Sequence, residues 1–125
     1  MIVYLAGGMR TPWRDEVRNF LTWKDITYLD PCDHHLSDSA QYTIWDLAAI
    51  DRCDVLFGYM EPDNPGGQGL ALEIGYARAR GKIVILADRS DNKYMRIVRT
   101  ASSVWFDNLY IAIDYLKTLY LVYKE

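Results

Sequence analysis

Several features are scarce in this 125-residue sequence, and each scarcity excludes a class of protein. It has only two cysteines, Cys32 and Cys53, which are too few for a disulfide framework, so free thiols and a cytoplasmic location are expected. The longest apolar run, residues 83–87, is too short to cross a bilayer, so no membrane partner is expected. No basic segment precedes an apolar stretch at the N-terminus, which predicts that it is not a signal peptide.

Excess positive charge and clustered metal ligands are also lacking. The 14 Lys and Arg residues against 17 Asp and Glu residues give a net charge of −3, so no nucleic-acid polymer is expected as a partner. Asp33, His34 and His35 are adjacent, point in different directions and have no Cys/His cluster beside them, which favours a polar loop over a metal site. Glycines 66, 67 and 69 match neither a P-loop nor the G-x-G-x-x-G spacing, and no cofactor is called for.

Apolar segments and helical patterns alternate along the whole chain. Runs typical of buried strands occupy residues 1–6, 25–29, 53–60, 83–87 and 103–106, and a helical pattern follows each of them. Because these strands are apolar runs rather than alternating ones, they predict a parallel sheet covered on both faces. We therefore predict an α/β fold with three layers and five parallel strands, forming a single domain over residues 1–125.

Capping residues and periodicity predict the first and last helices. Thr11 should cap a helix that runs to about residue 23, buries Phe20 and Leu21, and exposes Arg14. Asp107 should cap the last helix, whose apolar residues fall at spacings of 3, 4, 7 and 11. This predicted buried stripe consists of Leu109, Ala112, Ile113, Leu116 and Tyr120.

The segment from residue 64 to 81 carries the first candidate functional residue. Its glycine-rich turn leads into an Ala-rich helix that should start near Gly69, with Glu73 about one turn inside it. The helix dipole favours an anion there, so we expect an ionised carboxylate that suits a nucleophile. The alternative is a surface glutamate that only satisfies the dipole. Small neighbours at the ligand-binding edge of the sheet favour the functional interpretation.

Two further residues could converge on Glu73. Tyr4 lies in the first predicted strand, close enough to its end for the hydroxyl to reach the same edge, although a core tyrosine would have the same sequence signature. Asp46 lies between apolar residues of a predicted helix, where partial burial would raise its pKa and suit a proton donor. The alternative for Asp46 is a solvated helix face.

Several motifs, taken in order, resemble the nucleoside 2-deoxyribosyltransferase family. They are YLAGG at residues 4–8, DP at 30–31, WDLAAIDRCD at 45–54 and GLALEIGYA at 69–77, followed by GK at 81–82. Each motif is modest alone, and their order and spacing over most of the chain make the resemblance specific. The resemblance implies a flavodoxin-like fold and a double displacement at the glycosidic bond of a 2′-deoxynucleoside.

The same resemblance implies a role for each candidate residue. Glu73 matches the nucleophile, Asp46 the acid that protonates the departing base, and Tyr4 the tyrosine that orients the nucleophile. This agrees with retaining glycoside chemistry, in which a carboxylate traps the sugar and a second carboxyl group handles protons. The base pocket would be lined by Gly7, Gly8 and Met9.

The chain departs from the family pattern where the sugar would bind. Transferases of the family commonly carry an Asp six residues before the nucleophile, and this chain has Gly67 there. Asp63 or Asn64 could replace that Asp if the loop folds back, while Gly67 and Gly69 would leave room for the sugar. Nucleotide-hydrolysing relatives carry a serine near this point, and no serine lies between residues 54 and 88.

Three functions therefore stay open. The sequence favours a deoxyribosyltransferase of nucleoside salvage that acts on small-molecule nucleosides and nucleobases. One alternative is an N-glycosidase that hydrolyses a nucleoside or its 5′-monophosphate, and another is a non-catalytic nucleotide-sensing module. A homo-oligomer, a dimer or larger, is expected because sites of the family often borrow residues from a neighbouring C-terminal region. The aromatic residues available for this are Tyr115, Tyr120 and Tyr123.

Overall fold

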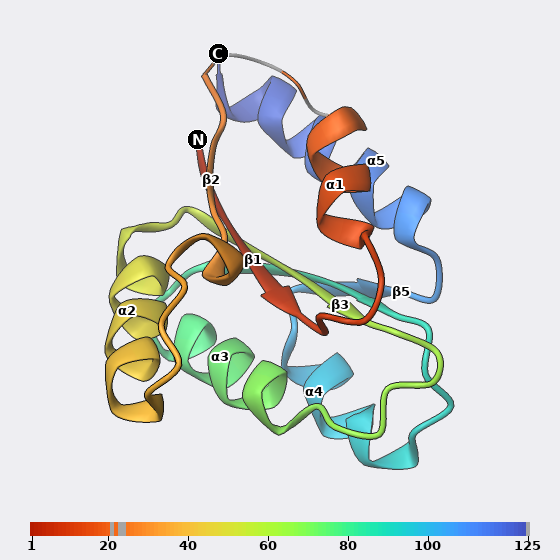
Figure 1. The fold of residues 1–125 in the computed structure, drawn as a ribbon. Coiled ribbons are helices and arrows are strands. Elements are labelled where there is room, and N and C mark those ends of the chain that lie inside the picture. Colours follow the sequence, from red (N-terminus) through yellow and green to blue (C-terminus); the bar gives the residue numbers. More distant parts are fainter. Residues whose placement is uncertain (21, 23–24, 125) are drawn as a thin grey trace.

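The computed structural model describes residues 1–20, 22 and 25–124 and is built around one parallel sheet (Figure 1). All of its strand pairs are parallel, and the strand order is β2-β1-β3-β4-β5. This order is the flavodoxin-like one, so the predicted fold class is confirmed. The strands are β1 (Ile2–Gly7), β2 (Thr27–Leu29), β3 (Val55–Met60), β4 (Ile83–Asp88) and β5 (Val104–Phe106).

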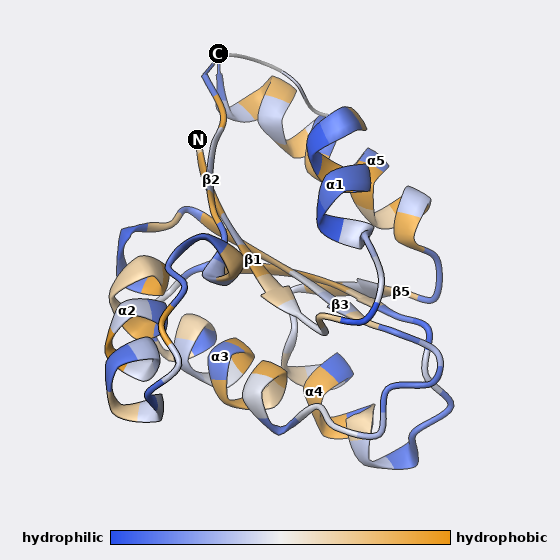
Figure 2. Ribbon diagram, in the orientation of Figure 1, coloured by the Kyte–Doolittle hydropathy of each residue, from blue (hydrophilic) through white to orange (hydrophobic). Residues whose placement is uncertain are grey.

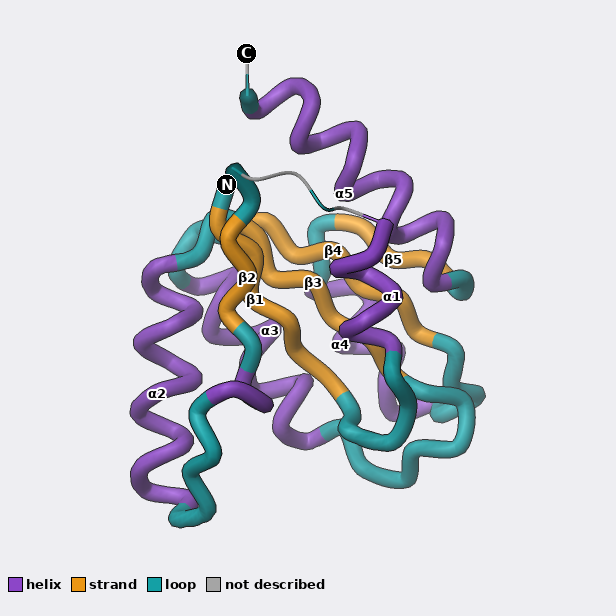
Figure 3. Tube along the Cα trace, turned by 45° about the horizontal axis from the view of Figure 1, so that its top comes forward, coloured by secondary structure: helices purple, strands orange, loops and turns teal. Residues whose placement is uncertain are grey.

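Helices cover both faces of this sheet, giving the three predicted layers. One face carries α1 (Trp13–Phe20) and α5 (Leu109–Tyr123), and the other carries the remaining helices (Figures 1 and 3). Those on the second face are α2 (Ser39–Arg52), α3 (Gln68–Ala79) and α4 (Arg96–Ala101). Two 3₁₀ turns, η1 (Pro31–Asp33) and η2 (Lys93–Met95), precede α2 and α4. No helix in the described part of the chain is long and apolar enough to cross a bilayer.

The core consists of two apolar layers, one on each side of the sheet. Alternate residues of β1 divide between them: Val3 and Leu5 pack under α1 and α5, whereas Tyr4 and Ala6 face α2 and α3. β3 is buried along its whole length, as expected for a central strand covered on both faces. Figure 2 shows the hydrophobic colour concentrated on the strands and on the helix sides that face them. Tyr4 therefore points toward α3 because of the pleat of β1.

The strand order reverses between β1 and β3. The chain passes from β1 through α1 to the outer strand β2, and then returns across β1 through α2 to β3. The loops after β1 and β3 consequently leave the sheet in opposite directions, which opens a crevice at the carboxyl ends of these strands. In open α/β sheets this is where ligands bind. The fold places the candidate residues of β1 and α3 at this point.

The first helix differs from its prediction. Phe20, predicted to be buried, is 60% exposed, and Arg14, predicted to be exposed, is only 6% exposed. The reason is that Arg14 is drawn under the β1–α1 loop by hydrogen bonds to the carbonyl groups of Gly7 and Gly8. The predicted burial of Leu21 lies outside the described residues.

The last helix confirms its predicted stripe but not its predicted cap. All five residues of the stripe are buried against the sheet. Asn108, rather than Asp107, is the N-cap, and its side-chain oxygen accepts hydrogen bonds from the backbone N–H groups of Tyr110 and Ile111. Both Asn and Asp are good capping residues, so composition alone does not choose between adjacent candidates.

Candidate active site

Tyr4 of β1 and Glu73 of α3 form a hydrogen-bonded pair. The Tyr4 hydroxyl donates to Glu73 Oε2 across 69 residues of sequence. Tyr4 is fully buried, and Glu73 is the sixth residue of α3, on the side of the helix that faces β1. Two of the three residues predicted to form the site are therefore in direct contact.

The ionisation of Glu73 is controlled by burial. Its pKa is raised to about 7: burial and the charge of Asp46 raise it, whereas the Tyr4 hydrogen bond and the positive charge of Arg14 lower it. The expectation of a fully ionised carboxylate near neutrality is therefore wrong. The helix dipole acts mainly within the first turn, and Glu73 lies beyond that turn, where desolvation of the charge dominates. Burial and the neighbouring Glu73 charge also raise the pKa of Tyr4, so its hydroxyl keeps its proton and donates a hydrogen bond to Glu73.

Asp46 extends from α2 toward the same pair. Its charge acts on both Tyr4 and Glu73, and burial raises its own pKa. The oxygen Oδ1 is buried without a hydrogen bond, and Nε2 of His34 lies 3.4 Å from it. Tyr4, Glu73 and Asp46 thus form one electrostatic group, with a carboxyl group on each of two helices.

His34 is a site residue that the sequence interpretation missed. Its ring lies edge-on to Trp45, with ring centres 4.8 Å apart, and its Nδ1 accepts a hydrogen bond from the backbone N–H of Leu36. The neighbouring His35 is exposed, so the two histidines do point in different directions, as the sequence predicted. His34 lies in a loop, as predicted, but the sequence did not indicate that this loop places its ring against Trp45 and Asp46 of α2. The only sequence feature that could have indicated a contact between His34 and Asp46 was an Asp in the helix that follows a polar, His-containing loop.

Arg14 supports the end of β1. Its guanidinium donates to the carbonyl groups of Gly7 and Gly8 and lies 3.1 Å from Asp30, which is itself buried. Gly7 has a φ of +142°, and a Cβ there would lie 2.2 Å from the carbonyl oxygen of Tyr59. The glycines predicted to form a base pocket therefore have a definite structural role, with their carbonyl groups turned toward Arg14.

Glu61 joins the loop after β1 to the loop after β3. Only 2% of this residue is exposed, and its Oε2 accepts hydrogen bonds from the backbone N–H groups of Arg10 and Thr11 and from the Thr11 hydroxyl. The Asn64 amide donates to Oε1. The sequence predicted that Thr11 caps α1. Instead, Thr11 binds Glu61. The buried carboxylate fixes the two loops that border the crevice.

Met9 lies on the outer edge of the crevice. It is 63% exposed, and its sulfur is 3.2 Å from the thiol sulfur of Cys32, at η1. The first loop is thereby brought against the segment that carries His34. Met9 is accessible to a ligand, as expected for a residue that borders a base pocket.

The loop predicted to bind the sugar uses Asn64 for its own folding. The Asn64 oxygen accepts the backbone N–H of Gly66, and its amide nitrogen binds Glu61. Asp63 is exposed, and the structure records no partner for its carboxylate among the described residues. Gly67 is the N-cap of α3 with a φ of +116°, and a Cβ on Gly69 would meet nothing within 4 Å. Space beside α3 is therefore present at Gly69, as the sequence predicted.

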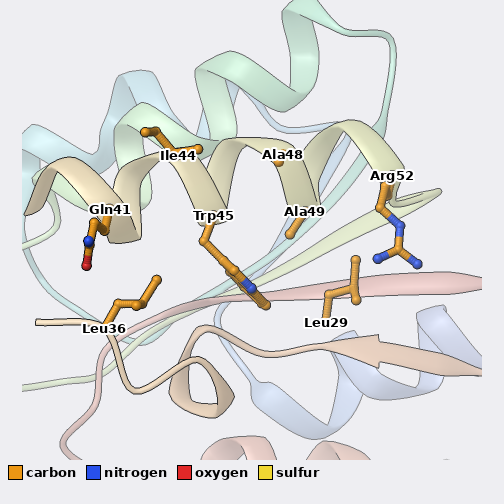
Figure 4. Close-up of a pocket in the computed structure, with 8 residues that line it drawn as sticks. All are labelled: Leu29, Leu36, Gln41, Ile44, Trp45, Ala48, Ala49 and Arg52. Carbon is orange, nitrogen blue, oxygen red and sulfur yellow. The ribbon is translucent and has the colours of Figure 1, made fainter. Parts of the chain in front are cut away.

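An apolar groove of about 540 Å³ lies between α2 and the segment after β2, with Trp45 in its lining (Figure 4). Trp45 extends from α2 toward the segment after β2, between Leu36 and Leu29. The groove contains none of the three candidate catalytic residues. Within the described part of the chain, no group of three or more His, Cys, Asp or Glu side chains could hold a metal ion.

Solved structures of similar fold include nucleoside-processing enzymes. A 2-deoxyribosyltransferase from Bacillus psychrosaccharolyticus aligns over 90% of both chains, with 20% identity and a TM-score of 0.70. A CMP N-glycosidase from Clostridium botulinum aligns over 94% of this chain and 99% of its own, with 26% identity and a TM-score of 0.68. A 2-desoxiribosyltransferase from Leishmania mexicana aligns over 70% of this chain and 64% of its own, with 25% identity and a TM-score of 0.60.

Sequence comparison identifies the family. Among curated proteins, none matches the chain. The family model described as "Nucleoside 2-deoxyribosyltransferase like" matches residues 1–90, which include β1 to β4 and the residues Tyr4, Asp46 and Glu73. The match covers more than half of the sequence, so the chain belongs to the nucleoside 2-deoxyribosyltransferase-like family.

Proposed function

We propose that this protein is an enzyme that transfers 2-deoxyribose from one nucleobase to another by double displacement, in nucleoside salvage. Membership of the family supports chemistry at the N-glycosidic bond of a nucleoside. The observation that carries the proposal is the buried Tyr4–Glu73 hydrogen bond, with Asp46 close enough to alter the pKa of Glu73. Two carboxyl groups in unlike environments are the usual requirement for glycoside chemistry.

In the first half-reaction, ionised Glu73 attacks the anomeric carbon of the nucleoside. The bond between this carbon and the base nitrogen breaks, its electron pair stays on the base, and the proton of Asp46 passes to the base. Tyr4 donates to Oε2 of Glu73 and so holds the carboxylate in orientation. The product is a deoxyribosyl ester of Glu73 and a neutral free base.

In the second half-reaction, a nitrogen of the incoming base attacks the same carbon. The ester bond breaks, Glu73 leaves as a carboxylate, and Asp46 takes the proton that the incoming base loses. Each group returns to its starting state, because the second half-reaction reverses the first with a different base. The base would lie along Gly7, Gly8 and Met9. The sugar would lie beside Gly67 and Gly69, with the exposed carboxylate of Asp63 as the candidate to bind its hydroxyl groups.

A hydrolase is the second candidate, and one observation favours it. The CMP N-glycosidase aligns over 94% of this chain with 26% identity, whereas the Bacillus transferase aligns over 90% with 20% identity. Water would then replace the incoming base, and a 5′-monophosphate could be part of the substrate. A non-catalytic sensor of nucleotides is disfavoured, because the chain keeps both candidate catalytic carboxyl residues, Glu73 and Asp46.

We also propose a homo-oligomer formed through α5. Exposed apolar side chains gather on this helix and suit contact with a second copy. Of the three tyrosines predicted to serve this purpose, Tyr115 and Tyr123 are exposed, but Tyr120 is buried and its hydroxyl binds Asp25. Light scattering after size-exclusion chromatography measures the mass directly, and a monomer at micromolar concentration contradicts this part of the proposal.

The activity is tested by incubating the protein with deoxyinosine, with and without adenine, and separating the products by chromatography. Parallel reactions contain CMP and its deoxy analogue. Deoxyadenosine formed only when adenine is present supports the transferase. Free base and free sugar formed without an acceptor support the hydrolase.

Glu73→Gln is the matched control because it keeps the size of the side chain but cannot form the ester. It should show no turnover while keeping the far-UV and near-UV circular dichroism of the wild type. Turnover by this variant at the wild-type rate would exclude Glu73 as nucleophile. Absence of any product from the wild type across these substrates would overturn the enzyme proposal.

A further inference from the structure

We propose that His34 is a positioning residue for the proton donor Asp46, holding one of its oxygens so that the other faces the departing base. This inference rests on the proposed function, because it assigns His34 a part in the proton transfer of Asp46. His34 lies outside the three residues that the family motifs identify, on the loop between η1 and α2. The contacts that carry it come from both ends of the imidazole ring.

The first contact defines which ring nitrogen carries the proton. Nδ1 of His34 accepts a hydrogen bond from the backbone N–H of Leu36, at 2.9 Å. A nitrogen that accepts this bond carries no proton of its own, so the proton of the neutral ring is on Nε2. The backbone of the loop thus selects a tautomer whose N–H group points toward α2.

The second contact is with Asp46. Nε2 of His34 lies 3.4 Å from Oδ1 of Asp46, and both side chains are mostly buried, with 10% and 19% of their surface exposed. Oδ1 is fully enclosed and has no closer partner among the described residues. The Nε2–H group of His34 faces Oδ1 of Asp46, so the proton that Asp46 transfers to the base is carried on the other oxygen, Oδ2. A small shift of the loop is enough to shorten this contact to a full hydrogen bond.

The third contact keeps the imidazole ring in place. Its edge packs against Trp45, which precedes Asp46 on α2, with an interplanar angle of 69°. Trp45 also forms a wall of the apolar groove, where Leu36 lies beside it (Figure 4). The same two residues that contact the ring, Trp45 and Leu36, therefore also line the groove.

The charged groups around Asp46 come from four parts of the fold. His34 on the loop after η1 and Arg14 on α1 both lower the pKa of Asp46, while burial raises it. Glu73 on α3 and Tyr4 on β1 complete the group. Of the two residues that lower the pKa, only His34 lies within 4 Å of an Asp46 oxygen among the described residues. Removing the His34 ring should therefore raise the pKa of Asp46 and leave the carboxyl group free to rotate.

The test uses three variants of the full chain. His34→Phe keeps an aromatic ring against Trp45 but removes the N–H donor. His34→Gln restores a donor near the position of Nε2. His35→Asn is the matched control, because His35 is exposed and has a φ of 56°, which Asn tolerates. Thermal unfolding confirms that each variant is folded.

The first measurement is kinetic and uses two nucleosides. Deoxyinosine needs protonation of its departing base, whereas the cationic base of 7-methyl-2′-deoxyguanosine departs as a neutral molecule without one. His34→Phe should lose about tenfold or more in kcat on deoxyinosine and little on the methylated nucleoside. The alkaline limb of its pH profile should move to higher pH, and His34→Gln should recover most of the rate. Equal losses on both nucleosides, or no rescue by Gln, would overturn the positioning role.

The second measurement needs no turnover. The ¹³C carboxyl resonance of Asp46 is titrated in the wild type and in each variant. A higher pKa in His34→Phe, with wild-type values in His34→Gln and His35→Asn, supports the contact, and an unchanged pKa in His34→Phe overturns it. If Asp46→Asn is inactive on deoxyinosine while His34→Phe is fully active, the inference fails and the proposed function stands. If the wild type cleaves no nucleoside, the proposed function fails, and the titration still decides whether His34 acts on Asp46.

Discussion

The Tyr4 hydroxyl donates a hydrogen bond to Oε2 of Glu73, and this joins the first strand to the helix that follows the third. The bond opposes the effect of burial on Glu73: burial favours the neutral acid, whereas the hydroxyl favours the carboxylate. A pKa of about 7 results, so Glu73 changes its charge near neutral pH. The proposed nucleophile is therefore active only in the fraction of molecules in which Glu73 is ionised.

Tyr4→Phe should move the acidic limb of the pH–rate profile to higher pH. The variant keeps the ring in the core but removes the hydrogen bond that lowers the pKa of Glu73. A hydrogen bond to a charged group contributes about 1.5–3 kcal/mol, which corresponds to a shift of about one to two pH units. The rate should be followed from pH 5 to 9, with Tyr94→Phe as an exposed control. A limb that stays in place would show that the bond does not govern the ionisation of Glu73.

Glu73→Gln should make the protein more stable at alkaline pH, although it abolishes turnover. The folded-state pKa of Glu73 is raised from 4.5 to about 7, so the native state binds more protons than the unfolded state between these values. Wild-type stability must then fall as pH rises through this window, by at most about 3 kcal/mol at 1.36 kcal/mol per pKa unit. Gln carries no charge and avoids this loss.

Urea unfolding at pH 4.5 and pH 8 measures this difference. The gain in unfolding free energy of Glu73→Gln should be small at pH 4.5 and largest at pH 8. Asp114→Asn, at an exposed position of α5, should show no such dependence. If Glu73→Gln and the wild type have the same unfolding free energy at pH 8, the raised pKa of Glu73 is contradicted.

Glu61→Ala should destabilise the protein and weaken substrate binding together. The substitution leaves three donors of the β1–α1 loop without their acceptor, namely the N–H groups of Arg10 and Thr11 and the Thr11 hydroxyl. Loss of a buried acceptor costs about 1–3 kcal/mol, so Tm should fall by several degrees. KM should rise because the loop borders the crevice. Asp63→Asn, two residues away and exposed, is the control for Tm. An unchanged Tm in Glu61→Ala would mean that water replaces the carboxylate at little cost.

The fold could be predicted from the sequence because its signals are local. Five apolar runs separated by helical patterns are sufficient for a covered parallel sheet, and the α5 stripe follows from its period alone. The predicted helix caps were wrong where several side chains could play the same role. Asn108, not Asp107, caps α5, and the Thr11 hydroxyl donates to Glu61 instead of capping α1. The single-domain organisation stays a prediction.

The candidate site was predictable only in part. Tyr4 and Glu73 were predicted from their places in the first strand and in the helix after the glycine-rich turn, and the structure brings them together. His34, Arg14 and Glu61 were missed, because each acts through a contact with another segment: His34 with α2, Arg14 with Asp30, and Glu61 with the β1–α1 loop. A charged residue in a loop is normally solvated, and nothing in the local sequence indicates that a loop will fold back over it.

Gly67→Asp, which introduces the Asp found at this position in many transferases of the family, should not create a sugar-binding carboxylate here. Gly67 has a φ of +116°, and a Cβ on it would lie 3.1 Å from the Met60 methyl group and 3.4 Å from the Met95 sulfur. This strain costs about 1–3 kcal/mol, so Tm should fall and turnover should not rise. Gly69→Ala is the matched control: its Cβ meets nothing within 4 Å, and Ala is the better residue inside a helix, so Tm should hold or rise. A rise in kcat/KM on a 2′-deoxynucleoside without loss of Tm would contradict this prediction. It would show that the loop can accommodate a side chain at position 67 and that an Asp there binds the sugar.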